Sequence, residues 1–167
     1  MNLILCGMMG VGKTTVGIKL AENTHRSWYD TDSVITEKYG KISDIFARYG
    51  EARFREIETE TVKALASADN LVISVGGGLV LKQENNEILQ RNGKIIYLRA
   101  SVETLEKRLQ GDSSRPLLQT EESLRERLEK LVQARAPSYE KAADYVVDVD
   151  GKTPEEIAAE IIALVEE

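Results

Sequence analysis

The strongest constraint on this chain lies at residues 7–14, which read Gly-Met-Met-Gly-Val-Gly-Lys-Thr and match the pattern G-x-x-x-x-G-K-[ST]. An apolar run at 3–6 precedes the motif, and a helical pattern begins at Thr14. A chain that turns at such glycines between a strand and a helix points successive backbone N–H groups at an anion on the helix N-terminus. A glycine-rich turn that only joins the two elements would not need the Lys13–Thr14 pair. The motif therefore predicts a nucleoside triphosphate site.

Two side chains of this loop have expected roles of their own. Lys13 should reach the outer phosphates, and the hydroxyl of Thr14 should enter the coordination shell of Mg²⁺. The residues of the loop expected to bind the nucleoside triphosphate are Gly10, Val11, Gly12, Lys13, Thr14 and Thr15.

Length and composition limit the classes of protein that remain. The 167 residues suit one domain, and 42% hydrophobic and 30% charged residues are ordinary for a globular protein. The net charge of -6 disfavours nonspecific binding to nucleic acid or acidic membranes. No segment is long and apolar enough to span a membrane, and Met1 runs directly into the first strand without room for a leader, so we expect a cytoplasmic protein. The single cysteine, Cys6, cannot form an internal disulfide.

Short apolar runs alternate with helical patterns along the chain. This alternation is typical of a parallel sheet that is covered by helices on both faces. The predicted strands are 3–6, 28–30, 71–75, 95–98 and 145–148. The predicted helices are 14–23, 33–39, 42–49, 51–66, 84–90, 102–109, 121–136 and 154–165. The fold class that we predict is a three-layer α/β/α fold with a five-stranded parallel sheet.

Two carboxylates two residues apart, Asp30 and Asp32, follow the second predicted strand. If the chain is still extended there, both side chains project to the same face at the carboxyl end of a parallel strand, where open α/β sheets bind their ligands. One carboxylate could then serve a metal ion and the other a substrate. The alternative is that Asp32 or Ser33 caps the next helix, with Asp30 as a solvated neighbour.

Arg55 and Glu58 are three residues apart and therefore lie on one face of a predicted helix. Arg55 could present its planar guanidinium to a substrate carboxylate while Glu58 holds it in position. A surface ion pair would give the same spacing.

Three consecutive glycines, Gly76, Gly77 and Gly78, follow the apolar strand 71–75. The absence of side chains lets backbone N–H groups approach a ligand closely, although a flexible turn would need only one of these glycines.

Taken in order, these motifs resemble those of the shikimate kinase family, and the resemblance covers nearly the whole chain. The matching elements are G-x-M-G-x-G-K-[ST]-T-x-G at 7–17, D-x-D at 30–32, G-E-x-x-F-R-x-x-E at 50–58, the glycines 76–78, R-P-L-L at 115–118 and R-x-x-x-Y at 135–139. The resemblance implies a P-loop kinase with a fold like that of the nucleoside monophosphate kinases. It further implies transfer of the γ-phosphoryl group of ATP to the 3-hydroxyl of shikimate, in the chorismate pathway to aromatic amino acids.

The resemblance also implies an organisation of the chain. Residues 1–167 would form a single kinase domain, with a mobile lid at about 110–120 and an acceptor-binding segment at about 32–60. The polar stretch 110–116, which contains both Gly111 and Pro116, has the composition of a mobile loop. The partners would be ATP or ADP and shikimate, the cofactor Mg²⁺, and the enzyme a monomer.

Residue roles follow from the same resemblance. Lys13, Asp32 and Arg115 would be catalytic, with Asp32 orienting and perhaps deprotonating the attacking hydroxyl and Arg115 closing over the transferring phosphate. Thr14 would ligate Mg²⁺ directly and Asp30 would hold it through water. The remaining roles are a carboxylate clamp of Arg55 and Arg135 with Glu58 as its support, backbone contacts of Gly77 and Gly78 with the substrate ring, and stacking of Arg108 on adenine.

Two other functions remain open from sequence alone. A gluconate or nucleoside monophosphate kinase would have a similar loop and lid, but the acceptor residues Asp32, Arg55 and Arg135 together suit a hydroxy acid. A nucleotide-binding regulator without transfer activity would not need Lys13, Thr14, Asp32 and Arg115 all intact.

Overall fold

The computed structural model describes residues 1–110 and 123–166. Its strands are β1 (Asn2–Cys6), β2 (Ser27–Asp30), β3 (Leu71–Ser74), β4 (Gly93–Arg99) and β5 (Tyr145–Asp148). Its helices are α1 (Lys13–Thr24), α2 (Thr31–Tyr39), α3 (Ile42–Ala66), the short 3₁₀ turn η1 (Leu79–Leu81), α4 (Gln83–Gln90), α5 (Val102–Leu109), α6 (Leu124–Ala142) and α7 (Pro154–Val165).

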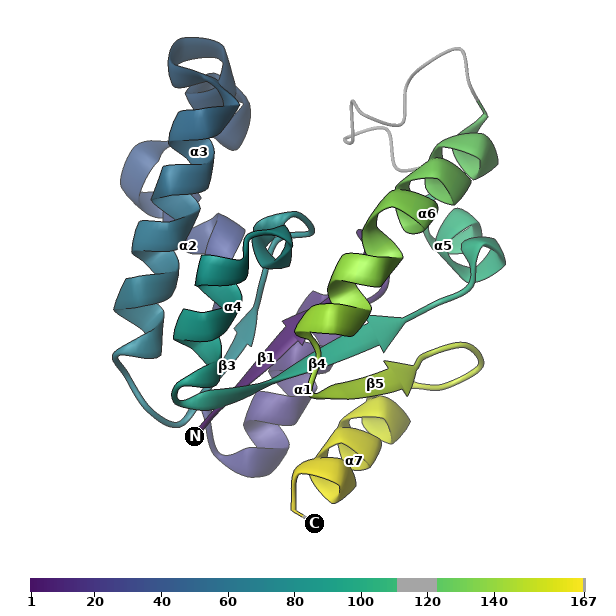
Figure 1. The fold of residues 1–167 in the computed structure, drawn as a ribbon. Coiled ribbons are helices and arrows are strands. Elements are labelled where there is room, and N and C mark those ends of the chain that lie inside the picture. Colours follow the sequence, from purple (N-terminus) through teal and green to yellow (C-terminus); the bar gives the residue numbers. More distant parts are fainter. Residues whose placement is uncertain (111–122, 167) are drawn as a thin grey trace.

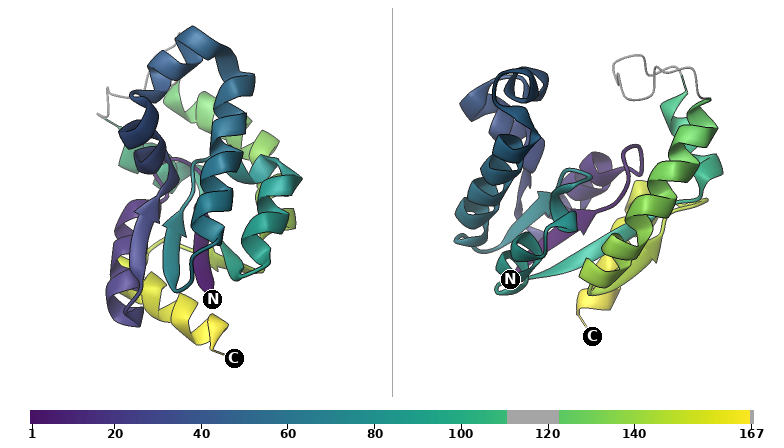
Figure 2. Two further views of the ribbon diagram at one scale, coloured as in Figure 1. Left: turned by 90° about the vertical axis from the view of Figure 1, so that its left-hand side faces the viewer. Right: turned by 45° about the horizontal axis from the view of Figure 1, so that its top comes forward.

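The strands form one parallel sheet in the order β2-β3-β1-β4-β5. Helices α1 and α7 pack together on one face, while α3, α4 and α6 lie on the other (Figures 1 and 2). The predicted α/β fold with five parallel strands in three layers is therefore confirmed. Because the chain leaves β1 toward one edge of the sheet and later returns to β4 on its other side, the carboxyl end of β1 lies at a topological switch point, where such sheets bind ligands.

The central strands are buried on both faces, as their unbroken apolar runs predict. Every residue of β1 and β3 is buried, and the main core extends from these strands to the inward faces of α1, α4, α6 and α7. Helix α7 begins with a capping box, in which the Thr153 hydroxyl accepts from the backbone N–H of Glu156 and the Glu156 carboxylate accepts from that of Thr153.

Helix α3 bends where two separate helices were predicted. Gly50 has φ 82° and ψ 172° within it, a region that is essentially restricted to glycine, so the helix changes direction there. The segment before the bend packs against a second, smaller core formed by Ile35, Ile45, Phe54 and Ile57. Residues 32–60, which were predicted to bind the acceptor, thus have apolar packing of their own, separate from the main core.

Helix α6 corrects one predicted boundary. The prediction ended the helix near residue 136, just before Pro137, but the helix continues through this proline to Ala142. Beyond the proline, Tyr139 is fully buried and its ring lies 5.1 Å from that of Tyr97 on β4. Tertiary packing thus outweighs the local cost of the proline. The predicted start at Glu121 lies outside the described residues.

Among the residues that the structure describes, no helix combines the length and apolar character needed to cross a membrane.

Candidate active site

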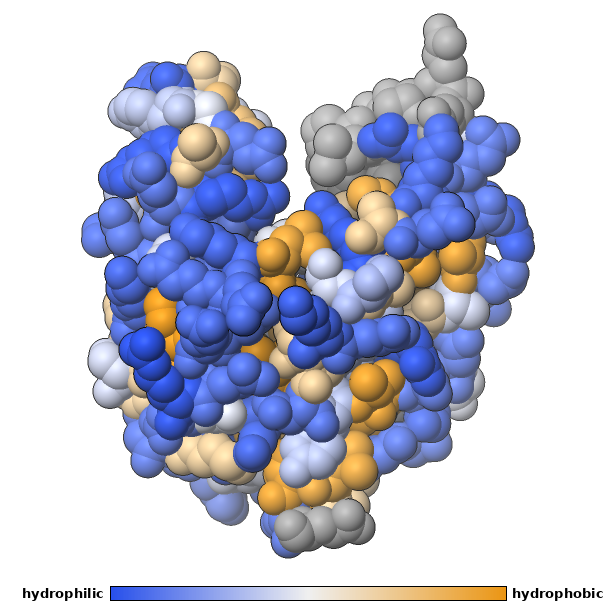
Figure 3. Space-filling view, viewed as in Figure 1, coloured by the Kyte–Doolittle hydropathy of each residue, from blue (hydrophilic) through white to orange (hydrophobic). Residues whose placement is uncertain are grey.

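A cleft of about 660 Å³ opens at the carboxyl ends of β1, β2 and β3. In the space-filling view the molecule is hollowed between the upper part of α3 and α6 (Figure 3). The residues that line the cleft are Met9, Gly10, Gly12, Lys13, Thr14, Thr15, Val16, Asp30, Asp32, Ile42, Phe54, Arg55, Glu58, Val75, Gly76, Gly77, Gly78, Arg108, Leu109, Arg135, Pro154 and Ile157.

The glycine-rich loop forms one wall of this cleft. Gly7, Gly10 and Gly12 all have positive φ, and Gly12 directly precedes the first turn of α1. A Cβ at Gly7 would lie 2.6 Å from the carbonyl oxygen of Leu98, so no side chain fits there. The loop therefore has the backbone geometry of a phosphate cradle at a helix N-terminus.

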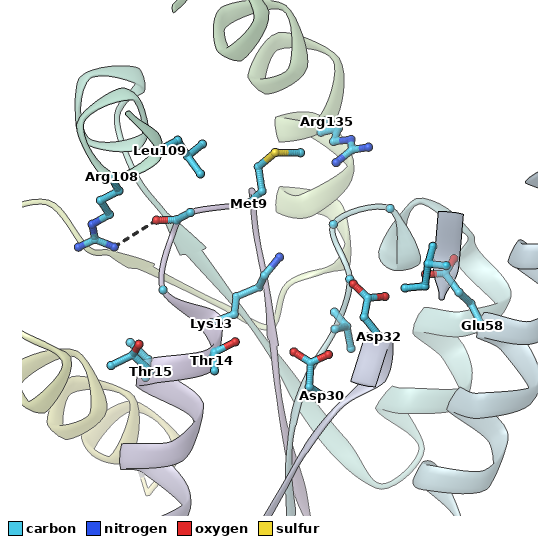
Figure 4. A pocket seen from close by; sticks show the side chains of 18 of the residues that line it. Met9, Lys13, Thr14, Thr15, Asp30, Asp32, Glu58, Arg108, Leu109 and Arg135 are labelled. Atoms are coloured by element: carbon cyan, nitrogen blue, oxygen red, sulfur yellow. Dashed lines mark hydrogen bonds between the residues drawn. The ribbon is translucent and has the colours of Figure 1, made fainter. Parts of the chain in front are cut away.

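The Lys13 side chain folds back along the loop. Its Nζ donates to the carbonyl oxygen of Gly7 at 2.6 Å and points into the cleft in Figure 4. Burial lowers the pKa of Lys13 to about 8, while the charges of Cys6, Asp32 and Asp30 act in the opposite direction. The ammonium group is therefore poorly solvated and suited to pairing with an incoming phosphate.

A hydrogen-bonded chain holds the start of α1 against β3. Trp28 Nε1 donates to Ser74 Oγ at 3.0 Å, and Ser74 Oγ donates to the carbonyl oxygen of Lys13 at 2.8 Å. A Cβ at Gly17 would lie 2.5 Å from Trp28 Nε1, so this glycine lets the indole lie against α1. The sheet thereby fixes the backbone from which the Lys13 side chain extends.

The two aspartates reach the cleft in a way that the sequence did not predict. The chain is not extended through Asp32, because α2 begins at Thr31. Asp30 caps this helix by accepting from the backbone N–H of Ser33 at 3.0 Å, whereas Asp32 or Ser33 was the cap considered from sequence. Asp30 at the end of β2 and Asp32 in the first turn of α2 nevertheless both line the cleft (Figure 4).

Asp32 faces the glycine triplet. A Cβ at Gly76 would lie 2.9 Å from Asp32 Oδ1, and the backbone N–H of Gly76 donates to Thr31 Oγ1 at 3.0 Å. Burial and the neighbouring charge of Asp30 raise the pKa of Asp32, while Lys13 and Arg55 partly offset the shift. The carboxylate is therefore more basic than that of an exposed aspartate.

Arg55 and Glu58 form the ion pair that their spacing predicts, with Nη1 donating to Glu58 Oε1 at 2.6 Å. Glu58 is only 1% exposed, so this is not a surface ion pair. Burial raises the pKa of Glu58, and the hydrogen bond from Arg55 opposes that shift. A Cβ at Gly78 would lie 2.7 Å from Arg55 Nη1, so the guanidinium lies against the last glycine of the triplet.

Arg135 reaches the same glycines from α6, on the opposite side of the cleft (Figure 4). A Cβ at Gly77 would lie 2.8 Å from Arg135 Nη1. One turn further along α6, Tyr139 donates to the carbonyl oxygen of Gly77 at 2.7 Å, and burial raises the pKa of this phenol to about 12. The glycine turn is thus enclosed between Arg55 and Arg135.

Arg108 on α5 lies at the phosphate loop. Its Nη1 donates to the carbonyl oxygens of Val11 at 2.7 Å and Gly10 at 3.5 Å (Figure 4). Its guanidinium is therefore placed beside the loop that would carry the phosphates. Arg115, and most of the predicted lid at 110–120, lie outside the described residues.

Thr14 and Asp30 supply oxygen donors on the nucleotide side of the cleft. No group of three or more metal-binding side chains occurs among residues 1–110 and 123–166. Mg²⁺ commonly takes only one or two protein ligands beside phosphate oxygens and water, so this sparse donor set fits it.

Three residues that hold this site together were not among the site residues predicted from the sequence. They are Thr31, Ser74 and Tyr139, which act through hydrogen bonds to backbone groups of Gly76, Lys13 and Gly77. Tyr139 lies within the R-x-x-x-Y element, which was the one available signal. Nothing in the sequence indicates the bonds made by Thr31 and Ser74.

A phosphate cradle, two aspartates and two arginines around a glycine turn define a P-loop kinase with a pocket for a small anionic acceptor. The model of the family described as "Shikimate kinase" matches residues 9–166. This chain belongs to the shikimate kinase family.

Individual relatives agree with the family match. The chain is 45% identical to the shikimate kinase of Thermodesulfovibrio yellowstonii over 96% of its own length and 92% of that protein. It is 46% identical to that of Streptococcus gordonii, over 95% and 96% of the two chains. Among solved structures, the shikimate kinase from Acinetobacter baumannii in complex with shikimate superimposes with a TM-score of 0.91 at 37% identity, covering 99% of this chain and 92% of the other.

Proposed function

We propose that this enzyme transfers the γ-phosphoryl group of ATP to the 3-hydroxyl of shikimate. The observation that carries the proposal is the convergence of Arg55, Arg135 and Asp32 in one cleft beside the phosphate loop. Two guanidinium groups suit a carboxylate, and a half-buried aspartate suits a hydroxyl. A nucleoside monophosphate acceptor would need recognition of its base, for which these residues offer no pattern.

In the proposed reaction the 3-hydroxyl oxygen forms a bond to the γ-phosphorus as the bond to the bridging oxygen of ADP breaks. The transition state is loose, so positioning and positive charge matter more than covalent chemistry. Lys13 supplies charge to the outer phosphates, and the backbone of Gly10, Val11, Gly12, Thr14 and Thr15 cradles them. When bound, Mg²⁺ would neutralise phosphate charge, with Thr14 as a direct ligand and Asp30 holding it through water.

Asp32 receives the acceptor hydroxyl in this proposal. Its raised pKa makes the carboxylate a better hydrogen-bond and proton acceptor than an exposed aspartate. Arg55 and Arg135 bind the shikimate carboxylate, Glu58 keeps the Arg55 guanidinium in place, and the backbone at Gly77 and Gly78 contacts the ring. This arrangement orients the 3-hydroxyl toward the phosphate loop.

Two arginines complete the proposed nucleotide side. Arg108, which borders the phosphate loop, stacks on adenine, and Arg115 closes over the transferring phosphate with the lid. Arg115→Ala removes a cation from the transferring group, so the rate of transfer should fall while shikimate affinity is unchanged.

We further propose that residues 1–167 act as a single kinase domain, with an acceptor segment at about 32–60, and that the enzyme works as a cytoplasmic monomer. Neither nucleic acid nor a membrane is part of the proposal.

A coupled assay of ADP release tests the acceptor directly. Shikimate, quinate, gluconate and nucleoside monophosphates are each added at one concentration with MgATP. We expect release with shikimate well above that with any other compound. Preference for gluconate or a nucleotide would reject the proposed acceptor, and no release with any compound would reject kinase activity.

A further inference from the structure

A polar cluster, buried except for one lysine, lies behind the acceptor wall of the cleft and lines no part of it. Its members are Asn85 on α4, Thr59 on α3 and Lys82 just before α4. Asn85 is 1% exposed, as buried as the apolar residues around it. A polar side chain is costly to bury unless its hydrogen bonds are made. The hydrogen-bond partners of Asn85 therefore identify the parts of the fold that this side chain joins.

The Asn85 side chain bridges two separate elements. Its Nδ2 donates to the carbonyl oxygen of Leu79 at 2.9 Å, and its Oδ1 accepts from Thr59 Oγ1 at 2.8 Å. Leu79 is the first residue of η1 and directly follows the glycine triplet. A single side chain therefore links the glycine turn to helix α3.

The α3 end of this bridge lies next to the arginine clamp. Thr59 follows Glu58 directly, and Thr59 Oγ1 also lies 3.2 Å from the carbonyl oxygen of Arg55. Lys82 Nζ donates to the same hydroxyl at 3.1 Å, which leaves the hydroxyl proton of Thr59 free to bond Asn85. The helical turn from Arg55 to Thr59 is thus joined to η1 through Asn85.

The separation that this bridge sets between the glycine turn and the Arg55 guanidinium is small. The Arg55 guanidinium lies so close to Gly78 that a Cβ there would be 2.7 Å from Nη1 and 2.8 Å from Nη2. A small shift of the glycine turn relative to α3 would therefore move Gly78 against the guanidinium or away from it. Either shift changes the pocket that the acceptor carboxylate and ring would occupy.

We propose that Asn85 is a positioning residue for the acceptor: by joining Leu79 to Thr59, it sets the separation between the glycine turn and the Arg55 guanidinium. This inference rests on the proposed function, because the acceptor is taken to be shikimate. Asn85 acts through Arg55 and Gly78 and touches neither substrate. The nucleotide side, built on β1 and α1, does not depend on it.

The chain contains a close control for this role. Asn2 is also 1% exposed and also bridges two backbone groups, donating to the carbonyl oxygen of Ala68 at 3.0 Å and accepting from the N–H of Leu71 at 2.9 Å. It lies at the amino ends of the strands, away from the cleft. Asn85→Ala and Asn2→Ala should therefore both lower the melting temperature of the protein. The two substitutions remove bridges in different regions of the fold, and only that of Asn85 lies beside the cleft.

The first test compares steady-state kinetics of the two full-length variants with wild type. Asn85→Ala should raise the KM for shikimate roughly tenfold, since small misplacements of binding groups are costly, with the KM for ATP within about twofold of wild type. Asn2→Ala should leave both constants near wild type. An unchanged shikimate KM in Asn85→Ala, or an equal change in both variants, overturns the proposal.

A second pair of variants decides the matter if Asn85→Ala does not fold. Thr59→Val removes the hydroxyl that bonds Asn85 and keeps the shape of the side chain, while Thr61→Val removes a hydroxyl that donates only to Ile57 within the same helix, at 2.8 Å. Thr59→Val should raise the shikimate KM and Thr61→Val should not. Equal kinetics for the two valine variants would overturn the proposal.

The double variant Thr59→Val/Asn85→Ala tests whether the two residues act through the hydrogen bond between them. If both residues act through their shared bond, the increase in shikimate KM should be less than the product of the single effects. Independent, multiplicative effects would contradict the bridge. Failure of the proposed function is separate, because it would appear as absence of shikimate phosphorylation by the wild-type enzyme.

Discussion

At the scale of single residues, the cleft combines partly or fully buried charges of both signs. Lys13, Arg55 and Arg135 face Asp32 and Glu58, and burial shifts the pKa of Lys13 downward and those of both carboxylates upward. Lys13, Asp32 and Glu58 are thus each less stable in their charged forms than they would be in water. An anionic phosphate and an anionic acceptor would supply the missing compensation for the cations.

Replacing Asp32 by asparagine removes the proposed hydroxyl acceptor and keeps the shape of the side chain. We expect Asp32→Asn to retain ATP binding and to lose about 10²- to 10⁴-fold in kcat, the usual contribution of a positioned acid or base. Isothermal titration with an ATP analogue and the coupled assay measure the two quantities. A kcat within a few-fold of wild type would refute the role.

The pKa of Lys13 predicts a dependence on pH. In the free enzyme Lys13 loses its proton as the pH rises through about 8, so kcat/KM for ATP should fall above that pH. Lys13→Arg keeps its charge throughout this range and should lack the fall, whatever its absolute rate. A flat wild-type profile to pH 9.5 would contradict the assignment.

The same shift has the opposite effect on stability. Because the folded pKa lies near 8 and the ordinary value is 10.5, the unfolded chain binds more protons between these values. The Lys13 contribution to the free energy of unfolding should therefore rise with pH in this window.

At the scale of elements, two glycines bound the helical segment that carries Ile42 into the cleft. Gly40 has φ 89° and Gly50 has φ 82°, and a Cβ at either would touch nothing within 4 Å. Their requirement is therefore for backbone conformation and not for space. This explains why G-E-x-x-F-R-x-x-E begins with a glycine eight residues before Glu58.

Gly50→Ala should strain the bend in α3, at a cost of about 1–3 kcal/mol. Because the bend places Ile42 in the acceptor pocket, we expect shikimate affinity to fall while ATP affinity holds. Gly151→Ala is a matched control, since Gly151 also has positive φ, 71°, with nothing near its Cβ. Equal loss of shikimate affinity in both variants would refute the role of the bend.

The sequence predicted the elements well where local signals were strong. Unbroken apolar runs located the strands, and the glycine-rich motif located the head of α1. Pro137 misled the prediction because the burial of Tyr139 is a tertiary effect. Asp30 was missed as a helix cap because an extended chain and a helix start are both compatible with an Asp-Thr-Asp sequence.

The candidate site could be predicted only in part, for a related reason. Side chains that face a ligand carry distinctive chemistry, as Lys13 and Arg55 do. Side chains that position them, such as Ser74 and Asn85, bond backbone groups far away in the chain, and an isolated serine or asparagine in a sequence has no such signature.

At the scale of the whole molecule, the two cores divide the protein into unequal parts. The main core runs through the sheet and its flanking helices, whereas the smaller core of Ile35, Ile45, Phe54 and Ile57 supports only residues 32–60, the proposed acceptor segment. So small a cluster contributes less to local stability than the sheet does.

Hydrogen exchange should reveal this division. In the free enzyme, amides of α2 and of α3 before Gly50 should exchange faster than those of β1 and β4, and shikimate should slow the former more than the latter. Mass spectrometry of peptides from each region measures both effects. Equal protection of the two regions in the free enzyme would show that the smaller core is no weaker.

The separate packing of the acceptor segment has a consequence for how new activities could arise. Residues 32–60 could vary with little effect on the main core, because their buried apolar side chains form a cluster of their own, provided that the hydrogen bonds of Thr31 to Gly76 and of Thr59 to Asn85 are kept. Selection for a different alcohol could then act on this segment together with Arg135 and the glycine turn, while the costly machinery for handling ATP stays constant.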